Sequence, residues 1–216
     1  MHEDRYLSGF HHRRHQPVSH ETRTISAHLT EFLVSSVVIA VLFVLGDLVS
    51  VYVFNPIQAV FFPQLTELAS LLFLPHGIRV LATVLLGLRA APGLVAGTAF
   101  VLFYVYGVRD VQLLIWISLI SGCVPWIVLR CMRSFGINAF YLKAQDGMPP
   151  FDNILTAGII CSVANGFLTT SMLELKGTIT QVSLTMAAYT VGDVTGLIAS
   201  WLLSNAILKF FTSMRK

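Results

Sequence analysis

Charged side chains are scarce in this chain. They make up 12% of its 216 residues, whereas 55% of the residues are hydrophobic, and an average soluble domain carries about 25% charged residues. A water-soluble globule of this size would lack the polar surface that covers a core. The composition therefore excludes a soluble enzyme or binding domain and predicts one integral membrane domain, an all-α polytopic bundle of transmembrane helices.

Motifs of known chemistry are missing as well. The three cysteines, Cys123, Cys131 and Cys161, have no CxxC spacing, so the sequence indicates neither a metal site nor a disulfide framework. There is no GxSxG elbow, no HExxH helix, no phosphate-binding glycine loop and no paired-carboxylate motif on a soluble face. We therefore expect a protein that is not an enzyme, and the sequence leaves its cofactors unknown.

A cleavable signal peptide is also lacking. Residues 1–28 are polar and rich in His and Arg, without an apolar core before a small-residue cleavage site, so we expect them to remain as a cytoplasmic tail. Four histidines of this tail could bind a metal, but they lack a rigid frame, and a tail beside anionic headgroups is the favoured interpretation. They are His11, His12, His15 and His20. The bundle is expected at residues 29–212, before a short basic end at 213–216.

Several hydrophobic stretches are long enough to cross a bilayer, which takes about 20 apolar residues. The candidates are residues 31–54, 57–88, 92–106, 111–129, 152–173 and 179–211. Asn55 and Pro56 are expected to end the first helix, and Asp152 or Asn153 to cap the fifth. Residues 57–88 are too long for one simple span, and the Pro-His-Gly sequence at 75–77 predicts a broken or re-entrant element there.

Basic residues are distributed unevenly between the ends of these spans. With the N-terminus inside, only Arg109 and Lys176 face outward. The tail arginines and seven further basic residues face the cytoplasm: Arg89, Arg130, Arg133, Lys143, Lys209, Arg215 and Lys216. This positive-inside bias predicts six spans, with both termini cytoplasmic in a bacterial inner membrane. Two full crossings by residues 57–88 would give seven. The same bias accounts for the net charge of +3, so membrane lipids are expected as partners and nucleic acid is not.

A few polar side chains lie within the hydrophobic stretches, where an ionisable group is costly and marks an interior or functional position. They are Asp47, Gln64, Glu67, His76, Arg79, Asn165 and Asp193. Asp193 lies between Gly192 and Gly196, which we expect to open the helix locally. Arg79 is expected to hold this carboxylate through two parallel hydrogen bonds in the lipid-shielded centre. Such a pair could fix the helix register, or it could form a ligand or proton site.

His76 lies in the expected break, between Pro75 and Gly77. Freed backbone groups are tolerated there only beside protein or a water-filled cavity. His76 could ligate a metal or haem, accept a proton, or satisfy the loop. Glu67 could couple protons or could reach the outer interface, and Asp47 is interpreted as structural.

Two stretches resemble the membrane-associated sensor family in its first-described type, a bacterial integral membrane domain that usually precedes diguanylate cyclases or histidine kinases. Residues 74–82 read LPHGIRVLA, residues 86–97 read LGLRAAPGLVAG, and residues 192–196 read GDVTG. Their order is similar to the family's Pro-x-Gly-Ile, Gly-x-Arg, Pro-Gly and Gly-Asp-x-x-Gly succession. The family usually has about eight spans and an aromatic residue where this chain has Leu74. The resemblance implies a free-standing member without an output domain.

Three functions follow from these patterns. The first is a sensory or small-ligand-binding membrane subunit that acts through a partner protein, with its site between residues 75–79 and 192–196. The second is a small solute transporter or the substrate-binding component of an importer. The third is a structural or assembly subunit of a larger membrane complex.

Overall fold

A computed structural model describes residues 19–63, 70–140, 150–177 and 182–214. All regular secondary structure in these ranges is helical, so the expected all-α class is confirmed. The elements are α1 (Ser19–Val49), η1 (Ser50–Phe54), α2 (Asn55–Phe61), α4 (Leu74–Leu86), η2 (Gly87–Ala90), α5 (Ala91–Tyr104), α6 (Val111–Ser134), α7 (Phe151–Leu175) and α8 (Val182–Met214).

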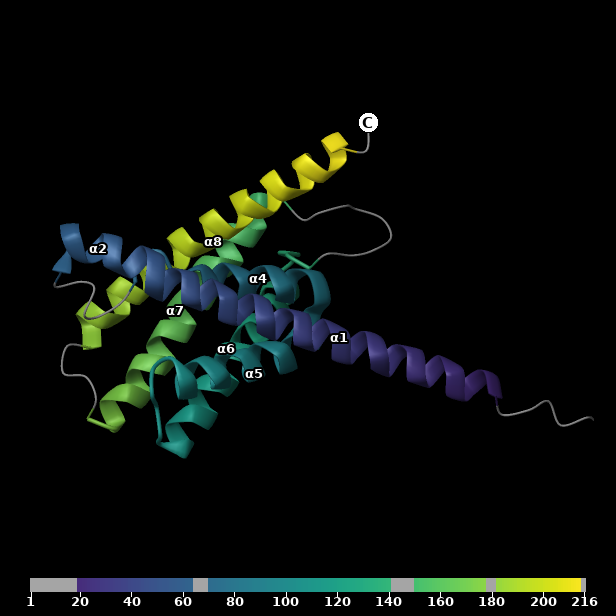
Figure 1. The fold of residues 1–216 in the computed structure, drawn as a ribbon, viewed down its shortest axis with the longest axis horizontal. Helices are drawn as coiled ribbons and strands as arrows, with labels where there is room; N and C mark the ends of the chain where they lie inside the picture. Colours follow the sequence, from purple (N-terminus) through teal and green to yellow (C-terminus); the bar gives the residue numbers. More distant parts are fainter. Residues whose placement is uncertain (1–18, 64–69, 141–149, 178–181, 215–216) are drawn as a thin grey trace, which may run out of the picture.

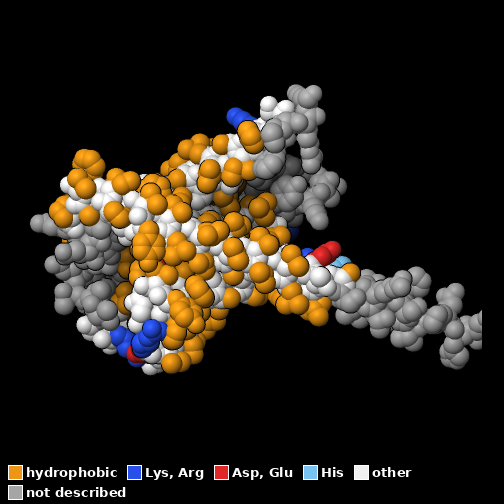
Figure 2. Space-filling model, viewed as in Figure 1, with side chains coloured by type: hydrophobic (Ala, Val, Ile, Leu, Met, Phe, Trp, Pro, Cys, Tyr) orange, Lys and Arg blue, Asp and Glu red, His pale blue; other side chains and the backbone are white. Residues whose placement is uncertain are grey.

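Five helical segments in the described ranges are long and apolar enough to cross a membrane. They are Ala27–Phe61, Leu74–Tyr104, Val111–Ser134, Phe151–Leu175 and Ser183–Ile207. Large hydrophobic side chains are exposed along α1, including Val37, Val41 and Leu45, and Figure 2 shows such side chains covering much of the visible face. A surface of this kind suits lipid and not water. The chain is therefore a helical membrane protein, although the expected count of six spans is not confirmed.

The first segment continues past the point where the sequence predicted its end. Asn55 and Pro56 lie inside a 35-residue segment that runs to Phe61. The helix continues because η1 is a π-helical turn, in which the Asn55 N–H donates to the Ser50 carbonyl five residues back. A wider turn accommodates a proline ring that an α-helical turn would exclude. The prediction of a helix end at Asn55-Pro56 was therefore wrong.

The second segment reverses direction at Gly87, whose φ of +60° and ψ of −136° suit only glycine. α4 runs antiparallel to α1, because Leu74 contacts Ser50 and Arg79 contacts Phe43. α5 then runs parallel to α1, from the contact of Gly93 with Ser36 to that of Tyr106 with Asp47. Helices of 13 and 14 residues are each about 20 Å long, so α4 and α5 form a short helical hairpin. Figure 1 shows α1 passing between the labels of α4 and α5, across the region that both helices occupy.

The hairpin accounts for the difference between the six expected spans and the five segments found in the described ranges. Residues 57–88 and 92–106 were expected to supply two crossings, but residues 74–104 form a single long segment interrupted only by η2. Pro75 lies in the first turn of α4, a position where proline needs no N–H partner, so 75–77 begins a helix and does not cut one. Residues 70–73, which precede it, are not helical. The start of α1 and the end of α8 lie on the same side of the molecule (Figure 1).

The last three helices pack as long antiparallel neighbours. α6 begins at Val111, as the charged turn before it predicted, and α7 begins at Phe151 after Pro150. Neither Asp152 nor Asn153 is the cap of α7, since the Asn153 side chain instead donates to the Asn138 carbonyl at 3.0 Å. α8 is continuous from Val182 to Met214, so the expected opening at residues 192–196 was wrong.

The two glycines of that motif serve close packing. A Cβ on Gly192 would overlap the Ser70 carbonyl oxygen, and one on Gly196 would overlap that of Phe73. Small residues let the backbones of neighbouring segments approach closely in a membrane bundle. Gly192 and Gly196 therefore seat the extended chain before α4 directly against α8.

Candidate ligand-binding cavity

The extended residues 70–73 are bonded to helices on both sides. The Phe73 N–H donates to the Gly192 carbonyl at 2.9 Å, and the Thr195 hydroxyl donates to the Leu71 carbonyl. The Leu71 N–H donates to Gln58 Oε1 at 2.6 Å. Non-helical backbone inside a membrane protein needs such partners, because lipid offers none. These bonds fix the start of α4, and with it the positions of His76 and Arg79.

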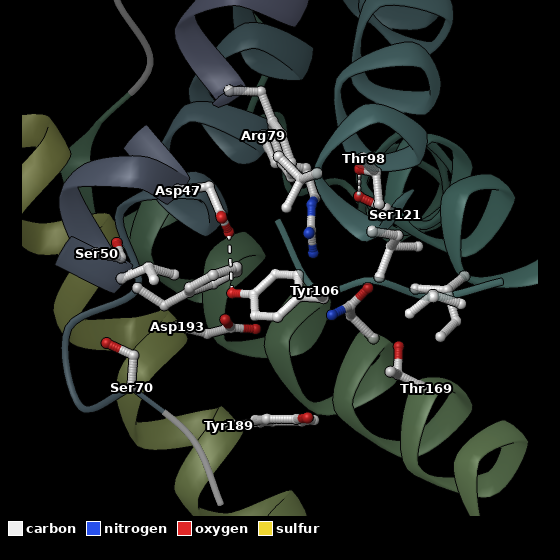
Figure 3. A pocket seen from close by; sticks show the side chains of 18 of the residues that line it. Asp47, Ser50, Ser70, Arg79, Thr98, Tyr106, Ser121, Thr169, Tyr189 and Asp193 are labelled. Carbon is white, nitrogen blue, oxygen red and sulfur yellow. Dashed lines mark hydrogen bonds between the residues drawn. The ribbon is translucent and has the colours of Figure 1, made fainter. Parts of the chain in front are cut away.

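A cavity of about 400 Å³ lies beside this segment. Volumes of this size hold small ligands. Its polar lining, part of which is labelled in Figure 3, comes from nearly every helix of the bundle. The polar residues are Asp47, Ser50, Asn55, Ser70, Arg79, Thr98, Tyr106, Ser121, Asn165, Thr169, Tyr189 and Asp193.

Arg79 supplies the cation of the cavity. It projects from α4, is 4% exposed, and has its guanidinium carbon 5.7 Å from the centroid of the Phe43 ring, a distance at which a cation is attracted to a ring face. Its Nε and Nη1 atoms are buried without a hydrogen-bond partner. Within the described residues it also forms no ion pair. Two donors of a buried guanidinium are therefore left for a bound molecule or for water.

Asp193 pairs with His76, so the predicted pair of Asp193 with Arg79 was wrong. His76 Nδ1 lies 3.0 Å from Asp193 Oδ2, and both side chains are almost fully buried. The geometry between these two atoms does not meet the criteria for a hydrogen bond, and neither atom has another hydrogen-bond partner. The contact is therefore primarily electrostatic. Asp193 also lines the cavity, and its charge acts on Arg79 from a greater distance.

The contact made by the second ring nitrogen of His76, Nε2, indicates that this nitrogen is protonated. Nε2 lies 3.1 Å from the Gly158 carbonyl oxygen, which can only accept, so Nε2 must carry a hydrogen. If Nδ1 were bare and Asp193 ionised, two lone pairs would face each other. A proton carried by either His76 Nδ1 or Asp193 removes this repulsion and makes the pair electrically neutral overall.

Asp47 is the second acid of the cavity, although the sequence interpretation treated it as structural. It is 1% exposed, and its Oδ1 accepts a 3.3 Å hydrogen bond from the Tyr106 hydroxyl. Its Oδ2 is buried without a partner, as is Asn55 Oδ1 one helical segment further along. Figure 3 shows Asp47, Arg79 and Asp193 directed toward a common space.

A hydroxyl pair forms another part of the lining. The hydroxyl oxygens of Thr98 on α5 and Ser121 on α6 are 2.6 Å apart and form a hydrogen bond, and both residues are buried. The remaining wall between the polar groups is apolar, with Phe43, Val101 and Ile117 among its residues. The cavity thus combines charged groups at one side with hydrophobic walls.

The structure brings three of the five candidate side chains to the cavity wall. Asp193, Arg79 and Asn165 line it, and His76 lies immediately behind Asp193. Glu67 lies outside the described residues, as does Gln64. Sequence reasoning did not select Asn55, Tyr106 or Tyr189, because an Asn-Pro pair is typical of a helix end and tyrosines are common at membrane interfaces.

A metal centre finds no support among the described residues. No group of three or more His, Cys, Asp or Glu side chains gathers in those ranges. His76 has its two nitrogens directed to Gly158 and Asp193.

The cavity lies toward the end of the bundle that carries Arg109 and Lys176, since Val108, Leu113 and Leu173 are in its lining. Lys176 pairs with Asp110 at 2.8 Å there, joining the connection before α6 to the one after α7. The side chain of Asp110 also accepts from the Leu113 N–H at 3.0 Å and so caps α6. The Lys176 hydrogen bond, with that from Leu113, lowers the pKa of Asp110.

Comparisons with known proteins place no relative beside this chain: no family model, no curated protein and no solved structure matches it.

Proposed function

We propose that this protein is a membrane receptor subunit that binds a small polar molecule and passes the occupancy of its cavity to a partner protein. The observation that carries the proposal is Arg79, a buried guanidinium with two unpartnered nitrogens on the wall of a 400 Å³ cavity. Burying a cation without a partner is costly, and such a cost is characteristic of a site that a ligand completes.

The arrangement of the helices supports transmission. The cavity is lined by α1, α4, α5, α6, α7 and α8 together, so a bound molecule contacts elements that are far apart in the chain. A ligand shifts a conformational equilibrium only through contacts that differ between two states. The hairpin of α4 and α5, which is shorter than a full span, is the element whose packing is best suited to such a shift.

The orientation belongs to the proposal. Arg89, Arg130 and Arg133 would lie at the cytoplasmic end of a bacterial inner membrane, with both termini, while Arg109 and Lys176 would lie outside. The cavity would then be reached from the outer side. The motif resemblance to the membrane-associated sensor family is consistent with this role and supplies the class of partner, a signalling protein.

Proton-coupled transport is a second candidate, and one observation favours it. The His76–Asp193 pair holds a proton beside the cavity wall, and intramembrane pairs of this kind serve as proton relays in transporters. Uptake that collapses with the proton gradient in proteoliposomes would identify a transporter. Binding without uptake would favour the receptor.

Native mass spectrometry of the gently purified full chain tests the proposal. The wild-type protein is expected to carry a small-molecule adduct, a partner chain or both, and Arg79→Ala and Asp193→Asn are expected to lose the adduct. Arg130→Ala, which removes an exposed arginine of α6, is the matched control and should retain it. Insertion into the membrane is checked for each variant. Identical spectra for wild type and both cavity variants would refute the receptor.

A further inference from the structure

The described lining of the cavity presents one cation without a hydrogen-bond partner and, apart from the Asp193 oxygen that faces His76, one carboxylate oxygen without a partner. Arg79 has Nε and Nη1 free of partners, and Asp47 has Oδ2 free of partners. The charges of the two residues act on each other, yet the described residues contain no ion pair between them. Two opposite charges that line a cavity without contacting each other can each bind an oppositely charged group of a ligand.

The third charged element of the cavity is already balanced. Asp193 lies 3.0 Å from the His76 ring, which is the group placed to balance its charge, and Arg79 and Asp47 carry opposite charges that cancel. A ligand with only a negative charge would meet Arg79 but would also approach Asp47. A ligand with only a positive charge would meet Asp47 but would approach Arg79. A ligand that carries both charges compensates both groups and leaves the buried charge at zero.

The rest of the wall indicates what the ligand carries besides its charges. Phe73, Val101, Leu113 and Ile117 line the cavity beside the charged groups. Apolar walls with a few placed polar groups are characteristic of sites for small amphiphilic molecules. From these contacts we infer that the ligand is a zwitterion with an apolar body, such as an aromatic α-amino acid. Its carboxylate binds Arg79, its ammonium binds Asp47 and its side chain packs on the apolar wall. This inference rests on the proposed function and specifies its ligand.

Three matched compounds separate the two charges. L-Phenylalanine carries both, 3-phenylpropanoate lacks the ammonium, and 2-phenylethylamine lacks the carboxylate. Calorimetric titration of the full chain in nanodiscs of phosphatidylglycerol and phosphatidylcholine is expected to give an affinity for L-phenylalanine at least tenfold above either analogue. This comparison uses only the wild-type protein, so it does not depend on the folding of a variant.

Substitutions then assign each charge to its residue. Asp47→Asn is expected to lower the affinity for L-phenylalanine at least tenfold, while the affinity for 3-phenylpropanoate changes less than twofold. Arg79→Gln is expected to lower the affinities for L-phenylalanine and 3-phenylpropanoate, which both carry a carboxylate, at least tenfold. Arg130→Gln, remote from the cavity lining, should leave all three affinities unchanged.

Each other outcome overturns the inference. Equal affinity for L-phenylalanine and 3-phenylpropanoate would show that the site binds anions. Equal affinity for L-phenylalanine and 2-phenylethylamine would show that it binds cations. Absence of L-phenylalanine binding would exclude the aromatic amino acid. The proposed function would survive each of these results if native mass spectrometry still showed an adduct that depends on Arg79, and it would fail with them if no adduct were present.

A phospholipid headgroup could supply the same pair of charges. Phosphatidylethanolamine carries a phosphate and an ammonium, so nanodiscs that contain it form a separate arm of the experiment. Retention of this lipid by wild type and its loss in Arg79→Gln, without binding of L-phenylalanine, would overturn the assignment to a free molecule.

Discussion

His76 and Asp193 lie 117 positions apart in the chain, and their side chains meet at 3.0 Å in the interior of the bundle. α4 and α8 run parallel here, with the segment before α4 bonded along α8. Because His76 donates from Nε2 to the Gly158 carbonyl, α7 joins the same contact. The imidazole ring of His76 on α4 therefore contacts both α7 and α8 beside the cavity.

Removing one member of this pair leaves the other buried alone. His76→Ala and Asp193→Ala are each expected to destabilise the protein by about 3–5 kcal/mol, the cost of breaking a buried pair. Asp193→Asn is expected to cost less, because an amide can donate to a neutral Nδ1 and keep the contact. Reversible unfolding in mixed micelles measures the free energies. If Asp193→Ala and Asp193→Asn were equally destabilising, the shared proton would have no support.

A double-mutant cycle gives the control. The variant that carries both alanines should be less destabilised than the two single changes added together, since no charge is left unpaired. Simple additivity would show that the two groups do not interact.

Glycine to alanine changes on α8 test the contact with the extended chain. Gly196→Ala would place a methyl group against the Phe73 carbonyl, a backbone atom that has no rotamer by which to move. Overpacking of this kind is expected to cost about 1–3 kcal/mol or more and to displace the start of α4. The free energy of unfolding, together with ligand affinity, provides the measurement.

Gly166→Ala on α7 is the matched control. A Cβ at Gly166 would meet its nearest neighbour, Met186, at 3.8 Å, which is ordinary contact. Alanine also forms helix better than glycine, by about 1 kcal/mol, so this change should be neutral or stabilising. If both variants behaved alike, close packing would not be the reason for Gly196.

Composition and charge were sufficient for the class of fold and for several helix boundaries. Val111 begins α6 as predicted, because Arg109 and Asp110 mark the end of a hydrophobic stretch. The cost of an ionisable group in lipid also pointed to Arg79 and Asp193, which line one cavity.

The partner of each buried group could not be predicted in the same way. His76 and Arg79 lie three residues apart, so they share one face of α4, and a small rotation of the helix decides which of them meets Asp193. Gly192 and Gly196 were ambiguous for a related reason. A small residue suits both an open backbone and a close contact, and only the position of residues 70–73 distinguishes the two.

Asp47 shows a third limit. Its position near the end of a hydrophobic stretch suggested a structural role, because the helix was expected to end at Asn55. The π-helical turn carries the helix onward, so Asp47 lies well inside the segment and faces Arg79 across the cavity. Because the helix does not end at Asn55, Asp47 does not lie at its edge.

Gly87 tests the reversal between α4 and α5. Its φ of +60° and ψ of −136° are strained for any residue with a Cβ, and no other atom lies within 4 Å of where a Cβ would be. Gly87→Ala is therefore expected to cost about 1–3 kcal/mol through the backbone alone. Unfolding measurements on Leu88→Ala, which changes the exposed neighbour, serve as the control. A neutral Gly87→Ala would mean that the chain does not turn sharply there.

The pair between Asp110 and Lys176 predicts a specific response to acid. Hydrogen bonds from Lys176 and from the Leu113 N–H lower the pKa of Asp110, so its ionised form is favoured in the folded state. This stabilisation is complete above the unfolded pKa of about 3.9 and is lost as the pH falls below it. Asp110→Asn keeps an oxygen to cap α6 but loses the charge, whereas Asp110→Ala loses both. At neutral pH the unfolding midpoint should therefore decrease in the order wild type, Asp110→Asn, Asp110→Ala.

The comparison across pH isolates this one carboxylate. Between pH 7 and pH 3 the wild type should lose more stability than Asp110→Asn, because all other acids are common to both proteins. Lys176→Gln should reduce the difference, since it removes the first of the two donors that lower the pKa. High salt should reduce it as well, because both side chains are partly exposed and their attraction is screened. Parallel pH profiles for wild type and Asp110→Asn would show that this contact does not hold together the connection before α6 and the one after α7.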